Sequence, residues 1–233
     1  MTLNELLPKL FPLGHEVREH DQMVMGYGQT PRGVVAIAGT TDHAYVGVEI
    51  ALALSSFVLK TMREHPGRPI LMLVDTLGQR LSRRDEMLGI NGYFGHLAKV
   101  LECARQAGHR LIALAHGEAV SGGFLSFGMM ADEIHALADA SVRVMNLPAM
   151  ARITKLPLER LEHLSRTSPV FAPGVENYLK MGGVHSVWTD AFAERLLEAL
   201  DGSDTADRRR ELGMERGGRT AAHRVAQRVR EAR

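Results

Sequence analysis

The sequence holds a single cysteine, few aromatic residues and no surplus of either charge. Cys103 is the only cysteine among 233 residues, so no internal disulfide can form, which is typical of a protein in a reducing compartment. Aromatic residues make up 5%, and 28 Lys and Arg side chains balance 27 Asp and Glu side chains. This composition gives no electrostatic or stacking argument for binding nucleic acid, and none for binding an anionic membrane surface.

Membrane and targeting segments are also missing. No run of about 18 apolar residues occurs, so we expect no segment that spans a bilayer. The first residues, MTLNELLPKLFPLG, lack the basic start, the long apolar run and the small-residue cleavage site of a signal peptide. We therefore expect a cytoplasmic protein with neither a membrane nor a nucleic acid among its partners.

Motifs for metal and nucleotide chemistry are absent as well. There is no Gly-x-x-x-x-Gly-Lys-Ser/Thr phosphate loop, and the lone cysteine leaves no paired cysteine ligands. In HEVREH, His15 and His20 are five positions apart, not the four of a zinc-binding helix. The sequence therefore predicts no metal site.

What is present is an ordinary globular composition with alternating apolar and amphipathic segments. Hydrophobic residues make up 45% and charged residues 24%, and this length can bury a real core. Continuous apolar runs separated by stretches of helical length are typical of an α/β fold with a largely parallel sheet and right-handed crossovers. We predict a helical or irregular lead-in over 1–14, a hairpin over 22–39, helices over 46–65, 87–107 and from 121, buried strands over 70–75 and 110–115, one or two short strands over 133–146, and loops over 39–43 and 76–86.

The C-terminal part has a different character. After Pro148 the pattern becomes helical and irregular, and the last thirty residues carry nine Arg against five acidic residues. This segment is either a basic arm or, as we favour, a solvated terminal helix lying on the domain or on a partner. We expect residues 1–233 to form a single domain with a helical segment from about 148.

Two junctions between a strand and the following segment are rich in glycine: VDTLGQ, ending at Gln79, and AHGEAVSGG, ending at Gly123. In a parallel sheet, segments that leave neighbouring carboxyl ends converge on one crevice. A helix that starts there presents unpaired N–H groups and partial positive charge to an anion. Gly122 and Gly123 would let an oxyanion approach the backbone, or they would only let the helix pack on the sheet.

These motifs and their spacing resemble the carboxyltransferase half of the crotonase superfamily. There the pattern runs DTPGA, then EE followed by Gly, a helix, a strand and GEGGSGGALA. Here it reads DTLGQ, then Asp85, Glu86 and Gly89 in register, then HGEAVSGGFLS. The positions that match are Asp75, Thr76, Gly78, Glu86, Gly89, Gly117, Glu118, Ser121, Gly122 and Gly123, within a core of about residues 70 to 145.

Within that superfamily, nearly the whole chain resembles the γ subunits of biotin-independent malonate decarboxylases, most visibly over ADASVRVMNLPAMARITKLPLERLEHLSRTSPVFAPGVENYLKMGGVHSVW. The resemblance implies a ClpP/crotonase-like α/β fold with repeated ββα units and a helical C-terminal region. Two departures from the carboxyltransferase pattern stand out. Leu77 replaces a proline, and EAV replaces EGG, which removes glycines from the pocket wall. We therefore expect no biotin.

The resemblance also implies a paired enzyme. A β subunit would complete a crotonase-type active site at the subunit interface, in a heterodimer or a higher oligomer. The substrate would be a malonyl thioester on the phosphopantetheine-type arm of an acyl carrier protein, and the products CO2 and the acetyl thioester. The C–C bond breaks as electrons flow into the thioester carbonyl, and N–H donors stabilise the resulting oxyanion. This chemistry requires no cofactor bound by this chain.

By the same resemblance, the β partner would hold the thioester carbonyl, while Gly122 and Gly123 would face the malonyl carboxylate or the nascent CO2. The residues for which we predict catalytic roles are Gly122, Gly123, Ser121, His116 and Glu118. The residues expected to contact substrate are Gly39, Thr40, Thr76, Gly78 and Gly117, because Gly39 to His43 follow another strand and line the same crevice.

Several of these residues have a structural alternative. The enolate carbon must gain a proton from His116, Glu118 or water, but Glu118 would equally cap a turn and His116 would equally end its strand. Ser121 is expected to cap the helix that follows it. On the loop after DTLG, Arg80, Arg83 and Arg84 would receive an anionic carrier protein or simply face solvent.

Three other functions compete with the decarboxylase interpretation. Ser121 at a glycine-flanked helix start resembles the nucleophile of crotonase-related serine peptidases, which would need a base within reach. The chain would alternatively be a non-catalytic scaffold that completes the pocket of its partner. A self-sufficient, hydratase-like enzyme acting on an enoyl thioester is the third possibility.

Overall fold

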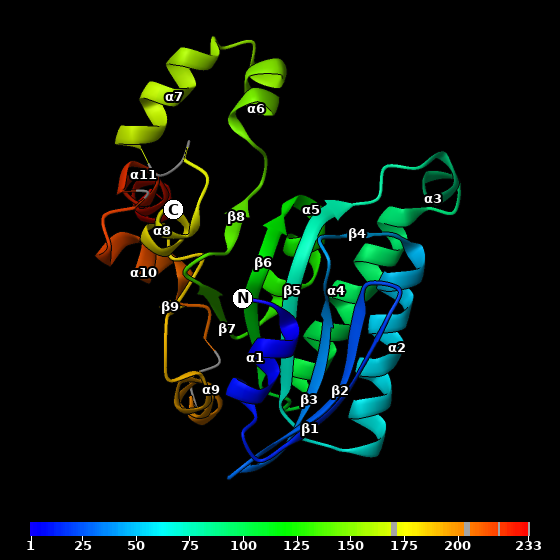
Figure 1. Ribbon diagram of the computed structural model, residues 1–233. Coiled ribbons are helices and arrows are strands. Elements are labelled where there is room, and N and C mark those ends of the chain that lie inside the picture. Colours follow the sequence, from blue (N-terminus) through cyan, green and yellow to red (C-terminus); the bar gives the residue numbers. More distant parts are fainter. Residues whose placement is uncertain (169–171, 203–205, 219, 233) are drawn as a thin grey trace.

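The computed structural model describes residues 1–168, 172–202, 206–218 and 220–232. Within them, one mixed sheet forms the centre of the molecule, with the strand order β1-β2-β3-β5-β6-β7-β9 (Figure 1). Two short strands lie off this path, β4 beside β5 and β8 beside β6. The strands are β1 His15–His20, β2 Met23–Thr30, β3 Gly33–Thr40, β4 Ala44–Val46, β5 Ile70–Gln79, β6 Leu111–Val120, β7 Glu133–Leu137, β8 Ser141–Arg143 and β9 Ser186–Trp188.

The order of the strands confirms the predicted α/β fold with a largely parallel sheet. β1, β2 and β3 pair antiparallel, and every later pairing in the sheet is parallel. The central parts of β5 and β6 are fully buried, because helices cover both faces and both must be apolar. The predicted hairpin over 22–39 corresponds to β2 and β3, and the lead-in forms a helix.

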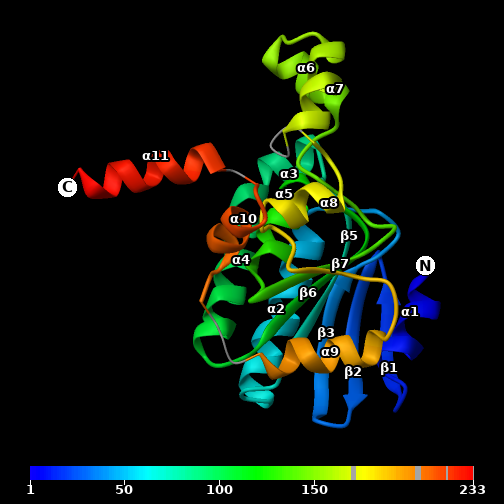
Figure 2. The same ribbon diagram turned by 90° about the vertical axis from the view of Figure 1, so that its left-hand side faces the viewer.

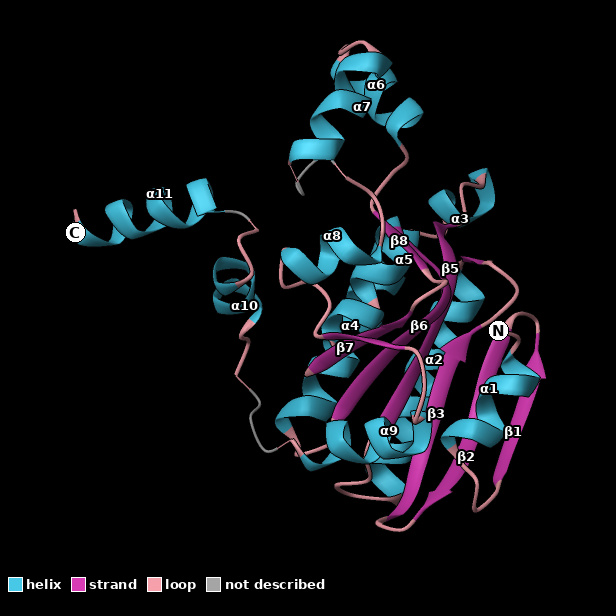
Figure 3. Ribbon diagram, turned by 60° about the vertical axis from the view of Figure 1, so that its left-hand side comes forward, coloured by secondary structure: helices cyan, strands magenta, loops and turns pink. Residues whose placement is uncertain are grey.

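Helices form a layer on each face of the sheet (Figure 3). α2 and α4 pack side by side on one face and bury residues at helical spacing, such as Leu54 and Val58 of α2 and Leu97 and Leu101 of α4. α1 and α9 cover the opposite face. The α-helices are α1 Leu3–Leu10, α2 Val48–Glu64, α3 Arg83–Met87, α4 Ile90–Gln106, α5 Ser121–Ser126, α6 Leu147–Thr154, α7 Leu158–Thr167, α8 Val175–Lys180, α9 Phe192–Asp201, α10 Arg209–Glu215 and α11 Thr220–Glu231.

The two longest parallel strands change neighbours along their length. Up to Leu73, β5 lies between β3 and β6, whereas from Thr76 it lies between β4 and β6. β6 has β7 beside residues 112–115 and β8 beside residues 118–120. A register shift between Val74 and Thr76 leaves residues 116–118 of β6 opposite Asp75. The sheet therefore has a corner at Asp75, where two strands pass from one set of partners to another.

Three strands extend further into this corner than the sequence predicted. β3 runs to Thr40, β5 to Gln79 and β6 to Val120, so the HGEAV segment and the first residues of the loops expected over 39–43 and 76–86 are strand. The end of the second expected loop belongs to α3. The polar and glycine-rich ends stay in the sheet because β4 and β8 give them extra parallel partners. β1 and β9 were not predicted: β1 is a largely exposed edge strand without an apolar face, and β9 has three residues.

The C-terminal segment is largely helical, as predicted; β9 adds a strand to the sheet and α9 lies on one face of it, whereas three other helices do not (Figures 2 and 3). α6 and α7 form a hairpin that projects from one end, and α11 extends away from the body (Figure 2). α10 is held to the body by Arg209, which donates to the Met129 carbonyl, and by the nearby Arg216, which donates to those of Val184 and His185. No helix among the described residues is long and apolar enough to cross a membrane.

Candidate active site

The corner of the sheet is organised by the buried carboxylate of Asp75. Its Oδ2 accepts the backbone N–H of His43 at 3.0 Å, and its Oδ1 accepts the backbone N–H of Glu118 at 2.8 Å. The His43 ring nitrogen Nδ1 lies 2.8 Å from the same Oδ1. Burial alone would raise the pKa of Asp75, but the two backbone N–H groups and the His43 ring hold it below its ordinary value. Asp75 is therefore an anion that ties β4 and β6 to β5.

Gly117 is a glycine because it packs against this carboxylate. A Cβ at Gly117 would lie 3.0 Å from Asp75 Oδ2 and only 2.4 Å from Oδ1, and the second distance is closer than real Cβ contacts in proteins. Gly117 was predicted to contact substrate. The position where a side chain would start faces the Asp75 carboxylate and not an open pocket.

His43 reaches the corner through a tight turn that sequence reasoning did not resolve. Asp42 and His43 adopt left-handed backbone conformations, with φ of 53° and 54°. This turn places the backbone N–H and the ring of His43 on Asp75, while 62% of the His43 side chain stays exposed. The only signal in the sequence was that residues 39–43 follow a strand.

His116 is buried at the same corner, one strand away. Its Nε2 lies 3.1 Å from the Thr40 carbonyl, and the Thr40 hydroxyl accepts the backbone N–H of Asp75. Burial lowers the pKa of His116, with a smaller opposing effect from the Thr40 carbonyl and Asp75. Nε2 therefore donates as a neutral imidazole at pH 7. The strand continues past His116, so the expectation that His116 ends it is wrong.

Glu118 forms an ion pair across to β8. Its Oε2 lies 2.5 Å from Arg143 Nη1, and the two side chains are 23% and 21% exposed. Glu118 lies within β6, so the alternative that it caps a turn is wrong. Arg143 was missed by sequence reasoning, because nothing in the sequence places β8 beside the end of β6.

Ser121 stands at the abrupt change from β6 to α5. Its φ is 50°, a left-handed conformation unusual for a residue other than glycine. The cap position belongs to Val120 and no side chain caps α5, so the expectation that Ser121 caps this helix is wrong. A Cβ at Gly78 would lie 3.1 Å from the Ser121 Cβ, so the DTLG strand end and the SGG junction are in contact. No hydrogen bond of the Ser121 hydroxyl is found within the described part of the chain.

Gly122 and Gly123 differ in what surrounds them. A Cβ at Gly123 would lie 2.7 Å from Thr76 Oγ1 and 3.1 Å from the Cα of Gly78, so this glycine is required for α5 to pack on β5. A Cβ at Gly122 would meet only the far end of the Gln79 side chain, at 2.6 Å from Oε1, and the Phe94 ring at 3.6 Å. The packing alternative therefore explains Gly123, and Gly122 is the more open of the two.

The remaining residues expected to contact substrate have structural roles at the corner. The Thr76 hydroxyl donates to the Ala44 carbonyl at 2.7 Å and accepts the backbone N–H of Gly78. Gly78 has a φ of 105°, and a Cβ on Gly39 would lie 2.4 Å from the Leu73 carbonyl oxygen. Thr40, Thr76 and Gly39 thus shape the corner, whereas Gly78 reaches the junction at Ser121.

The arginines after DTLG are largely engaged by carboxylates. Arg84 lies 2.5 Å from Glu49 and 3.3 Å from Asp85, and Arg80 lies 3.5 Å and 3.7 Å from the same two residues. Arg83 is exposed. The expected cluster of three arginines is therefore mostly neutralised, which weakens the case for it as an anion receptor.

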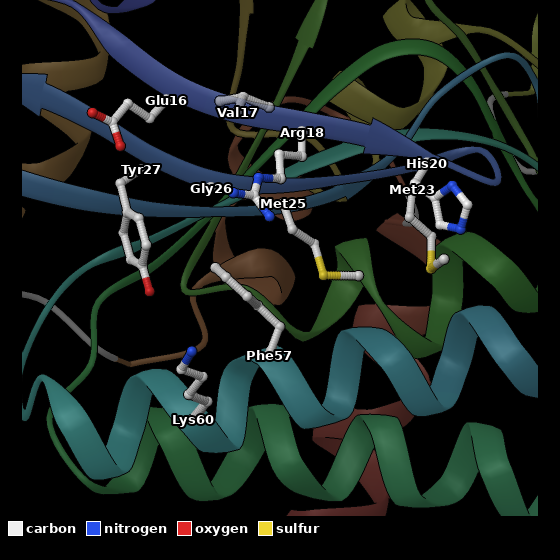
Figure 4. Close-up of a pocket in the computed structure, with 10 residues that line it drawn as sticks. All are labelled: Glu16, Val17, Arg18, His20, Met23, Met25, Gly26, Tyr27, Phe57 and Lys60. Carbon is white, nitrogen blue, oxygen red and sulfur yellow. The ribbon is translucent and has the colours of Figure 1, made fainter.

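A cavity of about 620 Å³ lies elsewhere, between the β1–β2 hairpin and α2 (Figure 4). Arg18 and Met25 point into it from the hairpin, toward Phe57 and Lys60 of α2. None of the predicted site residues lines it.

His15 and His20 lie on exposed β1, and no cluster of three or more potential metal ligands occurs among the described residues.

Comparison with known proteins identifies relatives over most of the chain. The family described as the malonate decarboxylase gamma subunit matches residues 41–233. The malonyl-S-ACP:biotin-protein carboxyltransferase MADD of Malonomonas rubra is 39% identical over 166 residues, which cover 67% of this chain and 54% of MADD. The chain thus spans about half the length of this curated relative.

Solved structures show the same fold. A Pseudomonas malonate decarboxylase hetero-tetramer in complex with coenzyme A matches with a TM-score of 0.79 and 27% identity over 97% of both chains. The Pseudomonas MdcD-MdcE hetero-dimer matches with a TM-score of 0.75 and 26% identity, again over 97% of both chains. Transcarboxylase 12S, with 18% identity and a TM-score of 0.70 over 86% of this chain and 41% of its own, shares the fold alone. The predicted crotonase-like carboxyltransferase fold is confirmed.

Proposed function

Because the chain belongs to the malonate decarboxylase gamma subunit family, we propose that it supplies one half of a malonyl-thioester decarboxylase. A β subunit completes the active site. The substrate is a malonyl thioester on an acyl carrier protein, and the products are CO2 and the acetyl thioester, which makes the pair a carboxy-lyase. The observation that carries this proposal is the junction of Gly78, Ser121 and Gly122, where two strand ends and the start of α5 meet beside the Asp75 corner.

The backbone at this junction suits the chemistry. Loss of CO2 moves an electron pair into the thioester carbonyl and creates an enolate oxygen. One preorganised N–H donor at such an oxyanion is worth about 3–4 kcal/mol of transition-state stabilisation. We assign the Gly122 amide, together with that of Gly123, to the carboxylate and nascent CO2, and the corresponding amides of the β subunit to the thioester oxygen. Exclusion of water by the partner strengthens both interactions.

The proton that completes the acetyl group is best supplied by water. His116 is buried as a donor to the Thr40 carbonyl, and Glu118 is paired with Arg143. Neither is free to deliver a proton without breaking the corner, so we assign both a positioning role. Gly39, Thr40, Thr76 and Gly117 act likewise, by fixing the strand ends that carry Gly78 and Gly122.

We further propose that residues 1–233 act as one domain, in the cytoplasm, in a complex with the β subunit and the acyl carrier protein. The similar Pseudomonas structures include a hetero-dimer and a hetero-tetramer, which supports a hetero-oligomer. The thioester arm of the carrier brings the substrate, and this chain holds no cofactor of its own. Similar Pseudomonas malonate decarboxylase structures are complexes with coenzyme A and with malonate, which suits a malonyl thioester site.

The name of the Malonomonas relative supports a second candidate, transfer of the carboxyl group to a biotin protein. EAV in place of EGG argues against it, because the buried side chains of Ala119 and Val120 fill space at the end of β6 where the carboxyltransferase pattern has glycines. Adding a biotin carrier protein to the assay separates the two. Biotin-independent CO2 release supports the decarboxylase, whereas turnover that requires the biotin carrier supports the transferase.

The serine-hydrolase alternative lacks a base. No imidazole or carboxylate among the described residues forms a hydrogen bond with the Ser121 hydroxyl, which a nucleophile of this kind needs. Labelling of Ser121 by a fluorophosphonate would support a hydrolase. The absence of labelling in a pair that releases CO2 would exclude it.

The proposal is tested with Gly122→Ala in the reconstituted β pair. The added methyl group displaces only the flexible end of Gln79, but it blocks approach to the amide. We expect kcat/KM for CO2 release to fall by about 10- to 150-fold, the range for losing a hydrogen bond to a charged group, because the amide no longer orients the carboxylate. Gly92→Ala on α4, where a Cβ meets nothing within 4 Å, is the matched control and should leave the rate unchanged. Full activity of Gly122→Ala in an intact pair would favour the scaffold interpretation.

A further inference from the structure

Two polar side chains lie next to Gly122, one from the end of β5 and one from the first residue of α5. The side chain of Gln79, the last residue of β5, ends where a Gly122 Cβ would stand, with Oε1 2.6 Å from that position. Ser121 directly precedes Gly122 and rests against Gly78 of the same β5 end. Gln79 was not selected from the sequence, because only the contact between β5 and α5 reveals it.

Neither side chain has a protein partner in the described residues. The hydrogen bonds found around the corner use Thr76, Asp75, Glu118 and Ser126, whereas the Gln79 carboxamide and the Ser121 hydroxyl form none. Both residues are half-buried. A half-buried amide and a half-buried hydroxyl that form no hydrogen bond within the protein can form hydrogen bonds with a ligand.

We propose that the Gln79 carboxamide and the Ser121 hydroxyl bind the carboxylate of the malonyl group above Gly122. The inference rests on the proposed function and identifies the residues that distinguish a malonyl from an acetyl thioester. A carboxylate is an acceptor with two oxygens, so the Ser121 hydroxyl donates to one of them. The Gln79 carboxamide, whose Oε1 faces Gly122 in the free chain, turns over so that its N–H donates to the other. Both approach from β5 and the β6–α5 junction, so they flank the Gly122 amide.

Neutral donors fit the reaction better than a fixed cation would. The carboxylate loses its charge as it becomes CO2, so an interaction that strongly stabilised the charge would stabilise the ground state more than the transition state. The carboxamide and hydroxyl orient the carboxylate and then release uncharged CO2 without leaving a buried cation. Arg80, which follows Gln79 in the chain, is directed to Glu49 and Asp85.

The test compares two ligands that differ only in the carboxylate. In the β–γ pair, KM for the malonyl thioester on its carrier protein is measured together with the inhibition constant of the acetyl thioester. Gln79→Glu keeps the shape but places a negative charge opposite the substrate carboxylate. We expect KM for the malonyl thioester to rise by about 10- to 150-fold, the range for a hydrogen bond to a charged group, and the acetyl inhibition constant to stay within about twofold.

Two further variants separate binding from folding. Ser121→Gly removes the hydroxyl at a position where φ is already in the glycine region, so the thermal midpoint should hold while KM for the malonyl thioester rises about 10-fold. Gln29→Glu makes the same charge change at an exposed strand position on β2 and should alter neither constant. Equal weakening of malonyl and acetyl thioesters, or no weakening of either, would overturn the carboxylate site.

Failure of the proposed function gives a different result. If the wild-type pair binds the malonyl thioester but releases no CO2, decarboxylation is refuted, and calorimetric affinities for the malonyl and acetyl thioesters still test Gln79 and Ser121. If the wild-type pair shows no preference for malonyl over acetyl thioester, the carboxylate site is refuted whatever the rate of CO2 release.

Discussion

Replacing Asp75 with Asn should loosen the corner that positions both strand ends. In the wild type, Oδ1 accepts the Glu118 N–H and Oδ2 accepts the His43 N–H. Asn has one acceptor oxygen and one NH2 group, so at least one backbone N–H faces another donor. An unsatisfied buried N–H costs about 1–3 kcal/mol, and loss of the charge weakens the remaining contacts, so we expect a total of about 2–4 kcal/mol.

Thermal unfolding of the chain at pH 7 measures this loss. At about 2–4 °C per kcal/mol for a domain of this size, Asp75→Asn should lower the Tm by about 5–15 °C. Asp139→Asn is the matched control: Asp139 pairs with the N-terminal ammonium at 2.8 Å but is 63% exposed, so its loss should cost less than about 1 kcal/mol. A Tm of Asp75→Asn within 1 °C of the wild-type Tm would show that the Asp75 carboxylate does not hold the corner together.

The same variant tests the charge of Asp75 through pH. Its pKa in the folded chain lies below the ordinary value, so its contribution to stability is fully present above the unfolded pKa of about 3.9 and is lost as pH falls through the folded pKa. The difference in Tm between the wild type and Asp75→Asn should therefore be constant near neutrality and shrink below about pH 4. A difference that stays constant into acid would mean that Asp75 is not stabilised as an anion.

Three further changes probe the corner and the junction. Gly117→Ala should destabilise the chain by about 1–3 kcal/mol in urea unfolding, because its methyl group would stand 2.4 Å from Asp75 Oδ1, whereas Gly92→Ala should be neutral or stabilising by up to about 1 kcal/mol. Gly123→Ala should cost about 1–3 kcal/mol through its clash with Thr76 and Gly78, so that, unlike Gly122→Ala, it lowers activity and stability together. Glu118→Gln should cost about 1–3 kcal/mol, because it leaves Arg143 without its carboxylate in a largely covered position; an unchanged unfolding midpoint would show that the pair contributes nothing.

The general plan of the fold could be predicted because burial leaves a clear trace in the sequence. The runs that became the centres of β5 and β6 are apolar at every position, and the helices between them have amphipathic spacing. Their polar ends could not be assigned to strands, since Asp75, Gly78 and Gly117 have low strand propensity, and β4 and β8 keep these ends in the sheet. The edge strand β1 was missed for the same reason, because its pairing and not its pattern makes it a strand.

The candidate site was located by its glycines, but its contacts were not predictable. Glu118, Ser121, Gly122 and Gly123 fall at the expected junction. The partners that define their roles are far away in sequence: His43 is 32 residues from Asp75, and Glu118 is 43 residues from it. No sequence motif predicts the left-handed turn at Asp42 and His43. Gln79 and Arg143 likewise could not be selected from the sequence, because their contacts with Gly122 and Glu118 arise only in the folded chain.

The most direct test of an active site shared between the two subunits is CO2 release from a malonyl thioester on its carrier protein, measured with the chain alone, with the β subunit alone and with the two together. We predict activity only in the pair, with no requirement for biotin. Activity from this chain alone, or none in a well-formed pair that binds the substrate, would contradict an active site shared between the two subunits.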